Sequence, residues 1–191
     1  MRITGGILGG RTLEVPRGDA IRPTQDRVRE ALFSMLQCEI PGAVFLDLFA
    51  GTGSAGLEAL SRGAASATFV EMNPRHLAVL RHNLELLGAN AGAATVVRAD
   101  AYRWIANYAG AGFTVAFADP PYALGEDRGY ASVLATLAAR GVVRPGGLFI
   151  AEMTAVQRAE ETAGWELLRD RTYGKTRLSV WRREAAGEVL R

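Results

Sequence analysis

The chain alternates short apolar runs with segments of helical periodicity, and this alternation restricts the folds that it can adopt. Helices are expected at about 56–62, 74–87, 102–108 and 130–139. The apolar runs, each expected to be a strand, are VFLDLF (44–49), SATFVE (66–71), ATVVRAD (94–100), FTVAFA (113–118) and GLFIAE (147–152). Strands that alternate with helices form a parallel sheet that helices cover on both faces. We therefore predict an α/β fold with a doubly wound sheet.

The two ends of the chain predict additional elements. Glycine pairs among apolar residues in Arg2–Val15 favour a β-hairpin, and the next segment predicts a helix at about 24–38 with Thr24 as N-cap. Trp165–Tyr173 and Thr176–Trp181 flank Gly174-Lys175 and predict a closing antiparallel hairpin. The full prediction is a seven-stranded, mostly parallel sheet with that closing hairpin, preceded by the small N-terminal hairpin and helix.

The segment DLFAGTGSAG (Asp47–Gly56) follows the first expected strand and has the pattern G-x-G-x-x-G. Glycines there let the backbone turn tightly and let a ligand approach the free N–H groups of a helix start. Glu71 ends the second strand, where its carboxylate can accept hydrogen bonds from two ribose hydroxyls. The pattern suits NAD as well as S-adenosylmethionine, and a tight turn that binds nothing is the alternative.

Three features favour the methyl donor S-adenosylmethionine. Asp47 lies within its strand and could face the amino group of the donor's methionine, and Asp100 ends the third strand, where it could meet the adenine amino group. The third feature is the sequence DPPY (119–122), which ends the fourth strand.

In DPPY, Asp119 and a nearby main-chain carbonyl such as that of Pro120 can accept hydrogen bonds from an exocyclic amine of adenine or guanine. This arrangement would aim the nitrogen lone pair at the donor's methyl group. Pro120 and Pro121 end the strand, because neither can donate to a sheet ladder, and their rings hold the loop rigid. Tyr122 offers a flat face for the base, and such stacking contributes roughly 1–3 kcal/mol. A strand-ending turn capped by Asp119 is the alternative.

Composition and charge limit the remaining possibilities. The 191 residues suggest one main domain, no apolar run approaches the length of a membrane span, and the single Cys38 fits a reducing compartment. We therefore expect a cytoplasmic protein without membrane contact. His76 and His82 lie too far apart around one helix to share a metal, so no metal is expected. Residues 1–29 and 165–183 are rich in arginine, which fits a polyanionic partner and a solvated surface about equally.

Nearly the whole chain resembles the bacterial 16S rRNA guanine-N2 methyltransferases of the RsmD type, within the Rossmann-like class I methyltransferases. The segments that carry this resemblance are RITGG, IRPTQDRVREALFSML, DLFAGTGSAGLEALSRGA, FVE, ADPPY and YGKTRL. The resemblance implies methyl transfer from S-adenosylmethionine to the exocyclic amine of a guanine in 16S rRNA. It also implies a substrate that is an assembled or assembling small ribosomal subunit. We expect a monomer.

The resemblance also assigns residues and regions. The donor site would comprise Asp47, Ala50, Gly51, Thr52, Gly53, Glu71, Met72, Asp100 and Ala101. The guanine would be held by Asp119, Pro120, Pro121 and Tyr122, and the RNA would be contacted by Arg11, Arg22, Arg27, Arg29, Lys175 and Arg177. Residues 1–40 would form an RNA-contacting region, and residues 41–191 would form the methyltransferase domain.

Two positions depart from the family pattern, and other functions remain open. Gly9 stands where the family commonly has a basic residue, and Asn73 replaces an aspartate after the second strand. DNA adenine-N6 methylation is the nearest alternative, because a DPPY sequence serves either amine. Protein-glutamine methylation usually has asparagine in place of Asp119. An NAD-dependent oxidoreductase would share the glycine loop and Glu71, and a non-catalytic RNA-binding module would share the basic ends.

Overall fold

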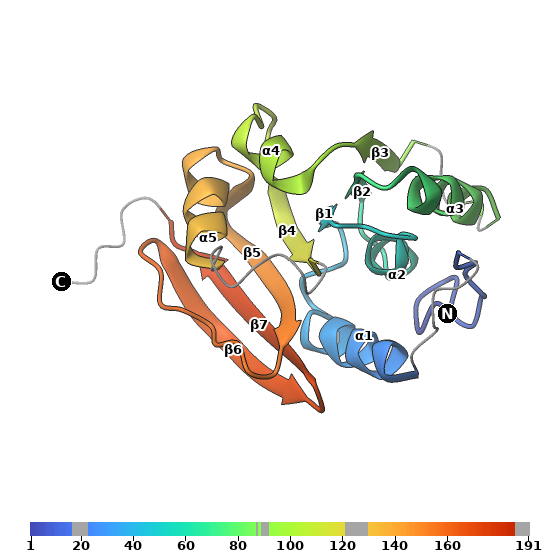
Figure 1. Cartoon of the computed structure of the whole chain (residues 1–191), viewed down its shortest axis with the longest axis horizontal. Helices are drawn as coiled ribbons and strands as arrows, with labels where there is room; N and C mark the ends of the chain where they lie inside the picture. Colours follow the sequence, from blue (N-terminus) through green and yellow to red (C-terminus); the bar gives the residue numbers. More distant parts are fainter. Residues whose placement is uncertain (17–22, 87, 89–91, 121–129, 186–191) are drawn as a thin grey trace. The chain divides into compact units, whose positions relative to one another are not determined.

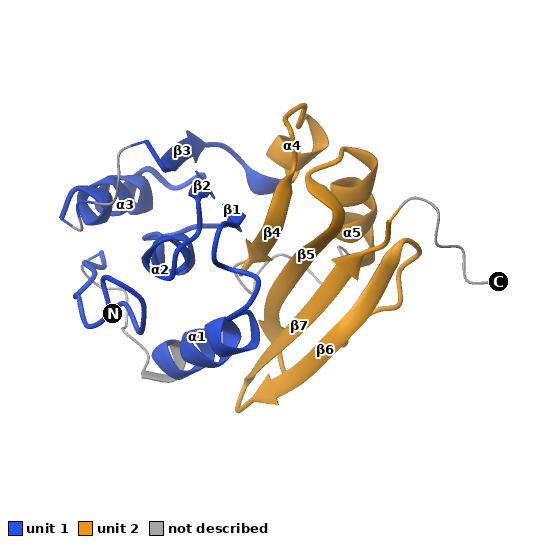
Figure 2. Cartoon of the chain, turned by 180° about the vertical axis from the view of Figure 1, so that it is seen from behind, with its two compact units in different colours: residues 1–101 blue, residues 102–191 orange. Residues whose placement is uncertain are grey.

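The apolar runs form strands close to their predicted positions (Figure 1). In the computed structural model, which describes residues 1–16, 23–86, 88, 92–120 and 130–185, there are seven strands and five helices. The side chains of residues 23–25 lie outside this description. Backbone contacts group the chain into two units, residues 1–101 and residues 102–191 (Figure 2).

The first unit contains three parallel strands in the order β3-β2-β1. The strands are β1 (Val44–Leu48), β2 (Ser66–Glu71) and β3 (Ala94–Arg98), and the helices are α1 (Pro23–Met35), α2 (Ser54–Ser61) and α3 (Pro74–Leu86). Helix α2 packs on β1 and β2, whereas α3 packs on β2 and β3. Phe45 and Phe69 are fully buried in the central strands, as expected for strands covered on both faces.

The second unit begins within α4 (Ala101–Ala106) and contains the other four strands in the order β4-β5-β7-β6. Its remaining elements are β4 (Phe113–Ala118), α5 (Tyr130–Ala139), β5 (Val143–Thr154), β6 (Trp165–Tyr173) and β7 (Thr176–Arg183). β4 and β5 are parallel, and β7 pairs antiparallel with both β5 and β6. Phe149 and Trp181 are fully buried in the core of this unit, and the Trp165 indole N–H donates to the Leu134 carbonyl at 3.1 Å. The predicted closing hairpin is confirmed.

Several element boundaries differ from the prediction for identifiable reasons. β1 ends at Leu48 because Phe49 has a φ of 65°, outside the extended region. α2 begins at Ser54, so Gly56 lies inside the helix instead of starting it. β5 begins at Val143, before the predicted strand start at Gly147, and its register with β4 shifts between Phe113 and Val115.

The predicted N-terminal hairpin is reduced to a short antiparallel pairing. Residues 1–16, here called the N-terminal segment, form only one isolated antiparallel bridge, between Arg2 and Thr12. Ile3 N–H donates to the Arg11 carbonyl at 2.9 Å, but no named strand develops. The segment is instead fastened to the helices of its unit.

Glu58 is the main attachment point for the start of the N-terminal segment. This residue of α2 is fully buried, and its carboxylate accepts hydrogen bonds from the Thr4 N–H and the Thr4 hydroxyl, both at 2.7 Å. Arg62 Nε lies 2.8 Å and Arg29 Nε 3.4 Å from the same carboxylate. The charge of Glu58 is therefore matched by two guanidinium groups and two neutral donors, as burial of a carboxylate requires.

None of the helices in the described part of the chain is long and apolar enough to cross a membrane.

Replacing Glu58 with glutamine should lower the free energy of unfolding by about 3–5 kcal/mol, because it leaves two guanidinium groups without their buried counter-charge. Urea denaturation measures this change. Glu160→Gln is the matched control, because Glu160 is exposed and its substitution should change stability by less than about 0.5 kcal/mol. Equal stability of the two variants would contradict the role given to Glu58.

Candidate functional site

The loop between β1 and α2, residues 49–53, is here called the glycine loop, and its backbone turns tightly. Phe49, Gly51 and Gly53 have φ values of 65°, 55° and 86°, all in the left-handed region. Gly53 N–H donates to the Ala50 carbonyl at 2.7 Å, which closes the turn, and Ala50 N–H donates to Val70 of β2 at 3.0 Å. A non-glycine residue at positive φ is uncommon and is often found at functional sites.

Two glycines of this region permit close packing. A Cβ atom on Gly53 would lie 2.2 Å from Leu80 Cδ1, and a Cβ on Gly56 would lie 2.2 Å from Phe69 Cε1. Neither side chain has room to retreat, because Leu80 and Phe69 are fully buried. The glycines therefore bring the start of α2 against β2 and α3, as the predicted G-x-G-x-x-G pattern requires.

Three side chains from three elements hold the backbone of the loop and of the first turn of α2. Asp47 of β1 accepts the Gly56 N–H at 2.9 Å, and Glu71 of β2 accepts the Gly51 N–H at 2.8 Å. The amide of Asn83 in α3 donates to the Thr52 carbonyl at 3.1 Å. Asp47 has 2% of its surface exposed, so it holds the first turn of α2 from the protein interior. Its predicted contact with a donor amino group stays a prediction.

The carboxylate of Glu71 is partly exposed and can accept further hydrogen bonds. Its second oxygen accepts the Asn73 N–H at 2.6 Å, and His76 Nδ1 lies 3.9 Å from the first oxygen. A carboxylate has about four acceptor positions, so two further donors, such as a pair of hydroxyls, can be bound. The neighbouring Met72 is 62% exposed, an unusual placement for a large apolar side chain.

Asp100 and Ala101 follow β3, the strand that neighbours Glu71. Glu71 pairs with Arg98 in the register of β2 and β3, and its carbonyl accepts the Ala99 N–H at 3.2 Å. Asp100 is half-buried and already engaged within the protein, whereas Ala101 is buried at the start of α4. The carboxyl ends of β2 and β3 thus bring these predicted donor-site residues together.

Of the DPPY sequence, Asp119 and Pro120 are described, whereas Pro121 and Tyr122 lie outside the described residues. Asp119 directly follows β4 and is partly buried, and this burial raises the pKa of its carboxyl to about 6. Tyr130 donates its hydroxyl to the Glu152 carbonyl at 3.1 Å. Burial and then the negative charge of Asp119 raise the pKa of the Tyr130 phenol above its usual range. Asp119 is therefore a largely ionised carboxylate at pH 7 in poorly solvated surroundings.

The predicted RNA-contacting residues have different environments. Arg11, Arg27 and Lys175 are exposed, whereas Arg22 lies outside the described residues. Arg177 Nη1 lies 2.5 Å from Asp170 Oδ2, and its buried Nε has no hydrogen-bond partner.

The structure corrects the assignment of Arg29. Its side chain is 6% exposed, lies 2.8 Å from Asp26, and donates to the Arg2 carbonyl as well as approaching Glu58. This guanidinium serves the interior of the first unit, and we omit it from the RNA surface.

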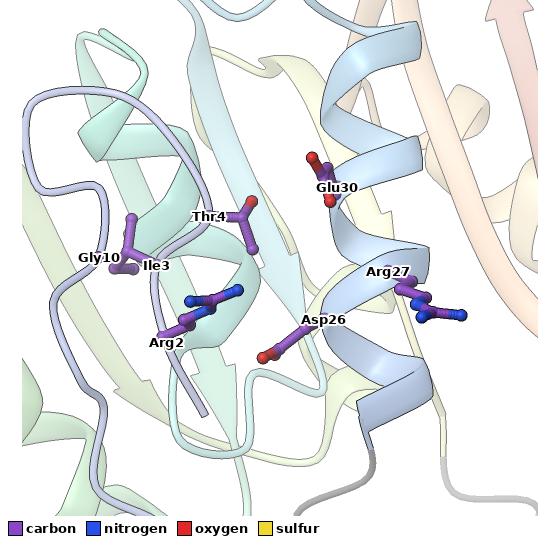
Figure 3. Close-up of a pocket in the computed structure, with 7 residues that line it drawn as sticks. All are labelled: Arg2, Ile3, Thr4, Gly10, Asp26, Arg27 and Glu30. Atoms are coloured by element: carbon purple, nitrogen blue, oxygen red, sulfur yellow. The ribbon is translucent and has the colours of Figure 1, made fainter.

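A cavity of about 460 Å³ opens between the N-terminal segment and α1 (Figure 3). Its lining contains charged residues of both signs, and Figure 3 shows the Asp26 carboxylate directed toward Arg2 while Arg27 points away. The residues that line it are Arg2, Ile3, Thr4, Gly10, Asp26, Arg27 and Glu30. The volume falls within the usual range for small-ligand sites, but its charges do not select one ligand class.

The sequence reasoning missed the buried polar residues that support the site. Asn83 and Glu58 are both fully buried, and neither was assigned a role. A signal was available for Asn83, because it lies three residues after Leu80 on the otherwise apolar face of α3. In the described part of the chain, no group of three histidine, cysteine or acidic residues could hold a metal.

Comparison with known proteins identifies the family. The family model described as "Conserved hypothetical protein 95" matches residues 1–182. The chain belongs to this family. The family resemblance stated from the motifs is confirmed by a relative named "Ribosomal RNA small subunit methyltransferase D" from Escherichia coli K12. It is 38% identical over 197 residues, which cover 98% of this chain and 92% of the relative. A Haemophilus influenzae relative of the same name is 32% identical over 91% of this chain and 89% of its own length.

Solved structures of similar proteins confirm the predicted fold class. The structure of yhhF from Escherichia coli has a TM-score of 0.84 and 38% identity, and covers 97% of this chain and 98% of its own. An RNA methyltransferase from Salinibacter ruber, solved with S-adenosyl-L-homocysteine, has a TM-score of 0.63 and 15% identity over 86% of this chain and 94% of its own. This family member therefore has the Rossmann-like class I methyltransferase fold.

Asp119→Asn should make this family member more stable above pH 6 and leave its stability unchanged near pH 4. Burial raises the carboxyl pKa from 3.8 to about 6, so the folded state holds its proton more tightly and loses stability as the pH rises through that window. Asp119→Asn has no carboxyl to ionise, so its free energy of unfolding at pH 8 should exceed that of the wild type by about 1–3 kcal/mol.

Urea denaturation at pH 4 and pH 8 measures the gain, with Glu160→Gln as the control for an exposed acid. A gain that is the same at both pH values would contradict the raised pKa.

Proposed function

We propose that this protein transfers a methyl group from S-adenosylmethionine to the exocyclic N2 amine of a guanine in 16S rRNA of the small ribosomal subunit. The observation that carries the proposal is the poorly solvated, ionisable Asp119 at the end of β4. It stands in a chain whose relatives are named for methylation of small-subunit rRNA. Family membership supports the coarser function of rRNA methyltransferase, and the guanine N2 atom is the finer part of the proposal.

The residues of the first unit fit the donor. Glu71 has free acceptor positions for the two ribose hydroxyls, and the exposed Met72 offers an apolar surface to the adenine. The glycine loop brings its backbone within reach of the methionine portion, and Asp100 and Ala101 are assigned to the adenine. S-adenosylmethionine supplies a sulfonium-bound methyl group, and the protein's task is to orient it.

Asp119 makes the acceptor amine a better nucleophile. The lone pair of an exocyclic amine is delocalised into the base, and hydrogen bonds from its N–H groups to Asp119 and to the Pro120 carbonyl favour a pyramidal nitrogen. Weak solvation strengthens these bonds, because water does not compete for the carboxylate. After transfer the nitrogen loses one proton, which the Asp119 carboxylate can accept. Stacking of the guanine on Tyr122 remains part of the proposal.

The exposed cations supply the attraction for rRNA. Arg11, Arg27 and Lys175 are exposed and available for phosphate contacts, and the family resemblance adds Arg22 and Arg177 to the proposed RNA contacts. We propose that the N-terminal region, residues 1–40, and the tip of the β6–β7 hairpin approach the RNA. The protein is proposed to act as a cytoplasmic monomer on an assembled or assembling subunit.

The deciding experiment follows a labelled methyl group from S-adenosylmethionine to unmethylated small subunits, free 16S rRNA and duplex DNA. Label recovered as N2-methylguanine in 16S rRNA would establish the reaction and the base. Label recovered as N6-methyladenine in DNA would retain the donor and overturn the substrate. Absence of label in all three would overturn the proposed function.

Asp119→Asn should lower the transfer rate by roughly 10²–10³-fold while donor affinity stays within about twofold, because the amide cannot replace the charged acceptor. In the wild type, kcat/KM should rise with pH up to about 6 and then level off, as the carboxyl ionises. Initial rates between pH 5 and pH 8.5 measure both effects. A rate that is independent of pH across this range would argue against Asp119 as the acceptor.

For the double variant Arg27→Gln, Lys175→Gln, the slope of log K against log salt concentration for 16S rRNA binding should be smaller in magnitude by about 2. Each removed cation means that binding releases about one counterion fewer from the RNA. Filter binding between 50 and 300 mM salt measures the slope. Arg140→Gln is the control, since Arg140 is also exposed but is not assigned to the RNA surface. If the control and the double variant have the same slope, these two cations do not contact RNA.

A further inference from the structure

Asn83 is a fully buried amide whose hydrogen bonds join two segments that are distant in sequence. Its side-chain oxygen accepts the Glu14 N–H at 2.8 Å. Its side-chain nitrogen donates to the Glu14 carbonyl and to the Thr52 carbonyl, both at 3.1 Å. Its donors and its acceptor are therefore all in use, and the partners are the N-terminal segment and the glycine loop.

The bond to Thr52 fixes one peptide unit of the glycine loop. The peptide between Thr52 and Gly53 has its carbonyl held by Asn83 and its N–H held by the Ala50 carbonyl at 2.7 Å. The residues around it include Gly51 and Gly53, both at positive φ, and glycine rotates more freely about its backbone bonds than any other residue. Without the bond from Asn83, this peptide plane has one tether in place of two.

We propose that Asn83 is a positioning residue for the methyl donor, because it holds the Thr52–Gly53 peptide in the orientation that the donor requires. This inference rests on the proposed function, which places the donor against the same loop. Asn83 acts through the loop backbone and need not touch the donor. The same amide also binds the backbone of Glu14, so the glycine loop and the N-terminal segment are both attached to Asn83.

Removing the tether should weaken donor binding more than it slows the reaction. In Asn83→Ala and Asn83→Asp, the glycine loop would spend most of its time in orientations that do not bind the donor. The apparent affinity for S-adenosylmethionine then falls in proportion to the fraction of molecules whose loop has the binding orientation. We expect the dissociation constant for S-adenosylmethionine to rise about tenfold, with kcat at saturating donor within about twofold of the wild type. Asn83→Asp keeps the acceptor for the Glu14 N–H and loses the donations to the Glu14 and Thr52 carbonyls.

The experiment combines calorimetric titration of S-adenosylmethionine with thermal unfolding of each variant. Leu137→Ala is the control for general destabilisation, because Leu137 is fully buried in α5 of the other unit. The inference is supported if both Asn83 variants lose affinity while Leu137→Ala, with an equal or larger loss of Tm, binds within about twofold of the wild type. It is overturned if affinity follows Tm across all variants.

Hydrogen exchange of the ligand-free protein gives a second test that is independent of catalysis. The Gly53 amide should exchange at least several-fold faster in Asn83→Ala, whereas the Gly56 amide, held by Asp47, should be unchanged. Unchanged exchange at Gly53 would overturn the inference even if binding were weaker. Failure of the wild type to bind S-adenosylmethionine would instead overturn the proposed function, and the inference with it.

Discussion

The close approach of the start of α2 to β2 and α3 is the constraint on which the candidate donor site depends. It is possible only because Gly56 presents no side chain to the ring of Phe69 and Gly53 presents none to Leu80. At this separation, Glu71 at the end of β2 accepts the Gly51 N–H, and Asp47 of β1 accepts the Gly56 N–H in the first turn of α2. A methyl group on either glycine would move the helix, and the loop would lose its fit to the acids.

Polar side chains buried in this unit must each have hydrogen-bond or charge partners, and the protein supplies these partners from distant segments. Glu58 is matched by Thr4, Arg29 and Arg62, whereas Asn83 is matched by Glu14 and Thr52. These bonds stabilise the N-terminal segment, which has only one β-bridge of its own. They also explain why a segment rich in glycine keeps a defined course.

The fold could be predicted because the spacing of apolar residues indicates which segments form strands and which form helices. β2, β4 and α5 have the bounds that the apolar patterns predicted, and Asn73 accepts the Arg75 N–H at 2.9 Å, as an N-cap should. Properties that depend on three-dimensional surroundings were not predictable. Arg29 is as basic as Arg27 in the sequence, yet only the position of Glu58 makes it an interior residue. The raised pKa of Asp119 depends likewise on burial, which no local motif encodes.

The attachment of the N-terminal segment has a consequence for the order of folding during synthesis. Thr4 binds a residue 54 positions later in the chain, and Glu14 binds one 69 positions later. Thr4 and Glu14 therefore lack these two partners until α2 and then α3 have also been synthesised. Long sequence separation makes such contacts slow to form. The N-terminal segment is thus among the last parts of its unit to become ordered, and the glycine loop gains its Asn83 tether only after α3 has been made.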